Sequence, residues 1–156
     1  MGYNRKIINR SGGGRMCLYS TKPRIYHHFE GLPGVESTSP HLRQHPLTGE
    51  WIGVAAARQG RTFLPNQAEC PFCVMRDGGS VTDIPVDDYE IAIFTNRFSA
   101  LSALPDLPPQ LGVATAPGLG FCEVVSYSAT HDASLATIGV ERIGLLIEAI
   151  GAQASD

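Results

Sequence analysis

The sequence has no run of about 18 apolar residues, so no segment of it predicts a membrane-spanning helix. It also lacks a secretory hydrophobic region, and its four cysteines in that context favour a reducing, cytoplasmic setting over a disulfide framework. The net charge of −3 gives no basis for binding nucleic acid. These absences exclude a membrane span and disfavour a secreted or nucleic-acid-binding protein.

What remains has the composition of a globular protein. With 43% hydrophobic and 17% charged residues, a chain of 156 residues can bury a core of its own. Charge is uneven, since seven of the 12 basic residues lie within the first 44 positions. Residues 1–40 show no periodicity, and Gly12 to Gly14 interrupt any helix there. We therefore expect a disordered basic extension over 1–40, with Met16 as an alternative start, and a folded domain over 41–156.

Three segments have the pattern of strands and one has that of a helix. Residues 51–57 follow a Pro-Leu-Thr-Gly turn, and residues 89–95 and 119–127 are β-branched or alternating. In residues 140–152, apolar side chains recur at helical spacing. This order predicts an α+β fold in which an antiparallel sheet of 51–57, 89–95 and 119–127 packs on one face against the helix 140–152.

Two short motifs could carry chemistry. Arg58 and Arg61 follow the first predicted strand and could form a fork for phosphate, although exposed arginines are most often simply solvated. Cys70 and Cys73 have the spacing of half a tetrahedral zinc site. Alternatively they are a redox pair or two buried thiols, and redox is the weakest choice because no βαβ pattern precedes them.

The order of these parts resembles the N-terminal half of galactose-1-phosphate uridylyltransferases, in the histidine-triad superfamily. The family pattern is R-x-x-P-L-T-G-x-W, followed by R-x-x-R and then C-P-x-C. The residues of this sequence that stand in those places are Arg43, Pro46, Leu47, Thr48, Gly49, Trp51, Arg58, Arg61, Cys70, Pro71 and Cys73.

The resemblance implies a nucleotide site. The arginines Arg58 and Arg61 would stabilise pyrophosphate charge, in the family on the nucleotide of a neighbouring subunit. An F-x-N-x-F segment would line the uridine pocket, with Phe94 and Phe98 against the base and Asn96 on a sugar or base edge. Many family members have Asp where this chain has Arg97, which could meet a phosphate instead.

The resemblance also implies a zinc site. Family members place a zinc-binding histidine in a C-x-V-x-x-x-S-x-x-H run, which matches Cys122, Val124, Ser128 and His131. Cys70, Cys73 and His131 are therefore expected to bind Zn²⁺, a metal that suits thiolate and imidazole ligands. Three ligands leave one position of a tetrahedral shell to be filled.

Family members work by double displacement, in which a histidine of an H-P-H motif takes UMP from UDP-glucose and passes it to galactose 1-phosphate. The 156 residues contain no His-Pro-His, which in the family follows the helix and completes the zinc shell. We expect the N-terminal part of a UDP-glucose–hexose-1-phosphate uridylyltransferase, inactive without a separate chain carrying the C-terminal half, and dimeric when assembled. The alternatives are an inactive remnant, a nucleotide- or zinc-binding module, or a small zinc-knuckle interaction domain.

Overall fold

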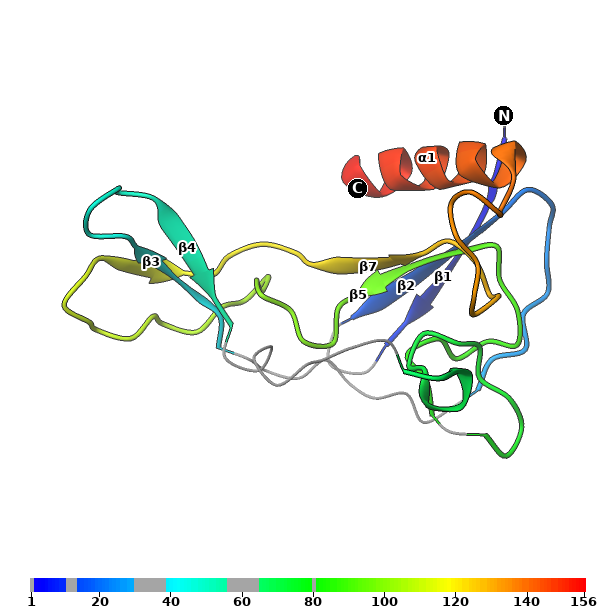
Figure 1. Cartoon of the computed structure of the whole chain (residues 1–156), viewed down its shortest axis with the longest axis horizontal. Helices are drawn as coiled ribbons and strands as arrows, with labels where there is room; N and C mark the ends of the chain where they lie inside the picture. The colour runs from blue at the N-terminus through cyan, green and yellow to red at the C-terminus, as the bar shows by residue number, and fades with distance from the viewer. Residues whose placement is uncertain (1, 11–13, 30–38, 56–64, 80) are drawn as a thin grey trace. The chain divides into compact units, whose positions relative to one another are not determined.

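The computed structural model describes residues 2–10, 14–29, 39–55, 65–79 and 81–156. A four-stranded sheet has the order β1-β2-β5-β7, and a three-stranded sheet has the order β4-β3-β6. None of the described helices is both long enough and apolar enough to cross a membrane. The elements, drawn in Figure 1, are β1 (Asn4–Asn9), β2 (Arg15–Ser20), β3 (His41–Gln44), β4 (Trp51–Val54), η3 (Gln67–Glu69), β5 (Ile91–Thr95), β6 (Thr115–Pro117), β7 (Glu123–Ser126) and α1 (Val140–Ala154).

The chain divides into two compact units. The first unit comprises Met1–Pro33, Leu64–Phe94 and Val125–Asp156, and the second comprises Gly34–Phe63 and Thr95–Val124. The first contains α1, β1 and β2, and the second contains β3, β4 and β6. Antiparallel strands and one packed helix confirm the predicted α+β class.

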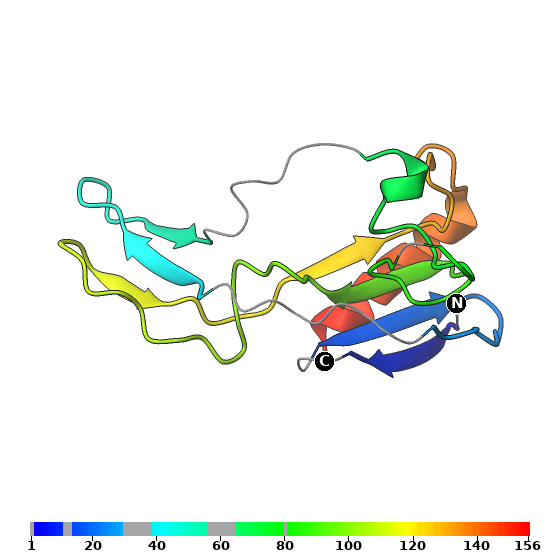
Figure 2. The ribbon, with the colours of Figure 1, turned by 90° about the horizontal axis from the view of Figure 1, so that it is seen from below.

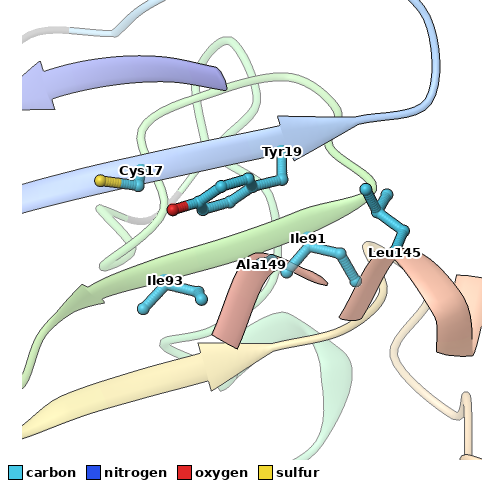
Figure 3. Close-up of a cluster of buried hydrophobic side chains, with 6 residues drawn as sticks. All are labelled: Cys17, Tyr19, Ile91, Ile93, Leu145 and Ala149. Carbon is cyan, nitrogen blue, oxygen red and sulfur yellow. The ribbon is translucent and has the colours of Figure 1, made fainter. Parts of the chain in front are cut away.

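The core of the first unit lies between α1 and one face of the four-stranded sheet. The Tyr19 hydroxyl lies 3.1 Å from Oε1 of Gln153 and joins β2 to the last turn of α1. Burying each large apolar side chain contributes about 1.5–3 kcal/mol, so this cluster holds the helix on the sheet. The side chains of the cluster, drawn in Figure 3, are Cys17, Tyr19, Ile91, Ile93, Leu145 and Ala149.

The expectation of a disordered extension over residues 1–40 was wrong for two segments, because 4–9 and 15–20 form β1 and β2. The two strands pair in antiparallel register from Asn4↔Ser20 to Asn9↔Arg15. In β2 the residues from Met16 to Tyr19 are fully buried, so both faces of the strand are covered. A strand buried on both faces shows no apolar–polar alternation, and this removed the signal on which the sequence prediction depended.

The predicted strand 51–57 was assigned to the wrong sheet. It begins as β4 (Trp51–Val54), which pairs with β3 from His41↔Val54 to Gln44↔Trp51, while 56 and 57 lie outside the described residues. The turn before it does form, and Gly49 has a φ of 74° that favours glycine. The turn therefore closes a local hairpin in which β4 pairs with β3.

A buried ion pair joins β1 to the segment before β5. The side chains of Arg10 and Asp83 are 1% and 8% exposed, with Nη2 and Oδ1 3.4 Å apart. The Arg10 guanidinium also lies 5.5 Å from the ring centre of Phe94, and the Asp83 N–H donates to the Pro71 carbonyl at 2.7 Å. The pair thus connects the end of β1 to the backbone of the Cys70–Cys73 turn.

We predict that Asp83→Asn lowers the free energy of unfolding by about 3–5 kcal/mol, because it leaves the buried Arg10 charge facing a neutral amide. Urea denaturation measures the change. Asp88→Asn is the matched control, since Asp88 is 61% exposed and pairs with Arg24 at the surface, where the loss should be under about 1 kcal/mol. Equal losses in the two variants would contradict a structural role for the buried pair.

Candidate metal centre

Local turns bring Cys70 and Cys73 together. The side-chain carbonyl of Asn66 accepts a hydrogen bond from the Glu69 N–H at 3.1 Å and caps the short helix η3. Cys70 follows that helix directly, and the Cys73 N–H points to the Cys70 carbonyl at 3.4 Å. Both cysteines are half-buried and neither forms a disulfide. The C-P-F-C motif is therefore a turn with its two thiols available to a common ligand.

His131 reaches the same place from a distant part of the sequence. It lies in the loop between β7 and α1, and its Nδ1 is 3.3 Å from Sγ of Cys73. The ligand atoms of Cys70, Cys73 and His131 all lie within 4.8 Å of one another. Among the described residues, this is the group of His, Cys, Asp and Glu side chains that is arranged to hold a metal ion.

The three ligand atoms fit the dimensions of a tetrahedral zinc site. Zn–S bonds of about 2.3 Å and Zn–N bonds of about 2.0 Å place neighbouring ligand atoms about 3.5–3.8 Å apart in a tetrahedron. The separation of Cys73 and His131 is close to this value, and the 4.8 Å limit on the whole group allows it with small side-chain movements. Thiolate and imidazole donors also suit zinc by type.

The Cys73 thiol is poorly suited to redox chemistry. Burial, followed by a hydrogen bond with Cys70, raises the pKa of the Cys73 thiol to about 11. A reactive cysteine has a lowered pKa, because the thiolate is the nucleophile. A bound cation would reverse this preference by favouring the thiolates directly. The geometry of the pair and the protonation of Cys73 therefore favour metal binding over a redox pair.

Tyr89 is a residue of this centre that the sequence analysis treated only as the start of a strand. It is 2% exposed, and its hydroxyl lies 2.7 Å from Oγ of Ser126, 2.6 Å from the Ser128 carbonyl and 3.4 Å from the Phe72 carbonyl. Burial raises the pKa of Tyr89 to about 12, so the hydroxyl keeps its proton at neutral pH. These contacts cannot be predicted from a local sequence motif, because they join residues that are 17 to 39 positions apart.

The residues predicted for the nucleotide site are not gathered in one described place. Arg58 and Arg61 lie outside the described residues. Phe94 belongs to the first unit, is 1% exposed, and has its ring centre 6.1 Å from that of Phe72. Stacking of Phe94 on a base would therefore require it to become accessible, and its role stays a prediction.

The other three candidates form one loop of the second unit. The Asn96 side-chain oxygen accepts a hydrogen bond from the Phe98 N–H at 3.0 Å, which leaves its amide group as the part to bond a ligand. The Arg97 guanidinium lies over the Phe98 ring at 5.1 Å. An arginine held against an aromatic ring is a preorganised cation, which suits a phosphate, but this assignment is also a prediction.

Comparisons with known proteins agree with the fold. A solved uridylyltransferase superimposes with a TM-score of 0.55 at 24% sequence identity, covering 74% of this chain and 34% of that one. No protein-family model matches the chain. The fold is therefore similar to that of about a third of this uridylyltransferase.

Sequence relatives make the relationship more specific. The chain is 37% identical over 112 residues to the galactose-1-phosphate uridylyltransferase of Thermotoga maritima, covering 69% of this chain and 33% of the relative. It is 30% identical over 129 residues to the ADP-glucose phosphorylase of Arabidopsis thaliana, covering 70% of this chain and 37% of the relative. The predicted resemblance to galactose-1-phosphate uridylyltransferases is confirmed, and the chain spans about a third of the length of these relatives.

We predict that Cys70→Ser weakens metal binding and removes most of the stabilisation by metal, because a hydroxyl is a poor zinc ligand at neutral pH. Zn²⁺ at about 100 times its dissociation constant should stabilise the unchanged chain by about 2.7 kcal/mol. Thermal melting with Zn²⁺ and with a chelator measures both effects. Cys122→Ser is the control, because Cys122 lies in the second unit and outside the cluster. Identical melting of the unchanged chain in zinc and in chelator would contradict the metal site.

Proposed function

We propose that this chain supplies the nucleotide-binding and zinc-binding residues of a UDP-glucose–hexose-1-phosphate uridylyltransferase. The observation that carries the proposal is the 37% identity to a galactose-1-phosphate uridylyltransferase over 112 residues. The meeting of Cys70, Cys73 and His131 in one cluster supports it, because these are the three residues that the family resemblance implies as zinc ligands.

Each group of residues has a distinct task in this proposal. Arg58 and Arg61 bind the pyrophosphate of UDP-glucose and stabilise the negative charge that develops as UMP is transferred. Asn96, Arg97 and Phe98, which lie in one loop, contact the nucleoside, and the role of Phe94 on the base follows from the resemblance alone. Zn²⁺ held by Cys70, Cys73 and His131 ties the turn to the loop and so stabilises the fold. The attacking histidine comes from outside these 156 residues, which contain no His-Pro-His.

The exposed apolar residues of α1, on the side of the helix away from the sheet, are evidence that the chain binds a partner. Val140, Ile147 and Ile150 are 86%, 66% and 46% exposed. Ile147 follows the buried Leu145 by two residues, which places it about 200° around the helix and away from the sheet. A helix that is apolar on both sides buries its second side against another element. We propose that this element belongs to a separate chain carrying the H-P-H half, in an assembly that is dimeric.

The identity of the nucleotide sugar is the second question, because one relative is an ADP-glucose phosphorylase. A pocket that recognises the base through Asn96 would discriminate uracil from adenine by hydrogen bonds, whereas stacking on an aromatic ring would not. The alternative to an enzyme is a nucleotide- or zinc-binding module that binds UDP-glucose or ADP-glucose without turnover.

A transfer assay tests the proposal. We expect no uridylyl transfer from UDP-glucose to galactose 1-phosphate by the chain alone, and transfer after mixing with the product of an adjacent reading frame that carries His-Pro-His. Arg58→Ala and Arg61→Ala should each lower the rate of the mixture about 10²- to 10³-fold, as loss of a charge-stabilising donor does. Lys6→Ala, at an exposed position of β1, should leave the rate unchanged.

The outcomes separate the candidate functions. Transfer by the chain alone would show that the nucleophile has been misassigned. No transfer by the mixture, together with binding of UDP-glucose by the chain, would establish the binding module instead. A mixture that accepts ADP-glucose in place of UDP-glucose would overturn the assignment of uridine.

A further inference from the structure

The Tyr89 hydroxyl lies between the two segments that carry the candidate metal ligands. On one side is Phe72, the residue between Cys70 and Cys73 that directly precedes the second thiol, with its carbonyl at 3.4 Å. On the other side is Ser128, three residues before His131, with its carbonyl at 2.6 Å. All of these residues belong to the first unit of the chain. The Tyr89 hydroxyl therefore lies against both the turn that carries Cys70 and Cys73 and the segment that leads to His131.

The single proton of the Tyr89 hydroxyl determines which of its neighbours donate and which accept. A phenol has one proton to donate, and both carbonyls can only accept. The Ser128 carbonyl is nearer by 0.8 Å and takes that proton, while the Phe72 carbonyl at 3.4 Å is at the limit of a hydrogen bond. The Ser126 hydroxyl at 2.7 Å must then donate to Tyr89. Tyr89 thus has a donor and an acceptor on the segment that leads to His131.

The loop that carries His131 is anchored at the same point. The Ser128 hydroxyl accepts a hydrogen bond from the Thr130 N–H at 3.0 Å, and the Ala133 N–H donates to the Thr130 carbonyl at 3.2 Å. These two bonds, which both involve Thr130, restrain the backbone on both sides of His131. A shift of Ser128 would move the imidazole relative to the thiols.

We propose that Tyr89 is a positioning residue for the metal centre, holding the His131 loop at the spacing from Cys70 and Cys73 that a metal ion requires. This inference rests on the metal site of the proposed function. Residues that orient metal ligands without touching the metal typically change affinity by about 10- to 100-fold when they are mutated. The change arises because ligands that are free to move must be ordered when the metal binds.

The test is Tyr89→Phe in the full 156-residue chain, which removes the hydroxyl and keeps the ring. Tyr19→Phe is the matched control, since Tyr19 is equally buried in the same unit and its hydroxyl bonds Gln153, away from the ligands. Zn²⁺ affinity is measured by competition with a chromophoric chelator. The visible absorption of bound Co²⁺ reports the coordination geometry, and urea denaturation without metal reports stability.

We expect both variants to lose stability without metal, and Tyr89→Phe alone to bind Zn²⁺ at least about tenfold more weakly and to alter the Co²⁺ spectrum. Affinity within about twofold of the unchanged chain, or a loss no larger than in Tyr19→Phe, would overturn the positioning role. Ser126→Ala is the second variant, and it should weaken Zn²⁺ binding in the same direction even if Tyr89→Phe does not fold. If the unchanged chain binds Zn²⁺ no better than Cys70→Ser, the metal site itself fails, and the positioning role fails with it.

Discussion

The burial of β2 on both faces is the constraint on which the four-stranded sheet depends. Cys17 and Tyr19 face α1, and Met16 and Leu18, which point to the opposite side by strand alternation, are equally inaccessible. Both faces of β2 are covered by packing, and its two hydrogen-bonding edges are paired with β1 and β5. The position of β5 is therefore set by its pairing with β2.

The placement of β5 also determines which segments meet at the candidate metal centre. β7 is the next strand beyond β5 and runs in the opposite direction, as Figure 2 shows. In such a pair the beginning of one strand lies beside the end of the other. Tyr89, just before β5, consequently meets Ser126, the last residue of β7. The pairing of β5 and β7 thus places the start of the loop that contains His131 beside the segment that precedes β5.

The parts that were predictable from the sequence are those with local signals. The helix over 140–152 repeats at 3.6 residues and extends to Ala154, and the turn at Gly49 has the residue that its positive φ favours. β2 was missed because full burial removes alternation, and β4 was misplaced because pattern does not specify a strand's partner. The contacts of Tyr89 were beyond sequence reasoning for a different reason, since a tyrosine at a strand start is compatible with many environments.

The candidate centre can keep a similar charge with and without a metal ion. Without metal, burial keeps the Cys73 thiol protonated and therefore neutral. A Zn²⁺ ion with two thiolates and the neutral imidazole of His131 also carries no net charge, so both forms avoid the cost of placing charge in a half-buried site. A fourth ligand that is neutral keeps this balance, whereas a carboxylate would add a negative charge. The Tyr89 hydroxyl, with a pKa near 12, adds a hydrogen bond without adding charge. A metal ion bound by Cys70, Cys73 and His131 would therefore hold two segments of the first unit together without adding net charge to the half-buried site.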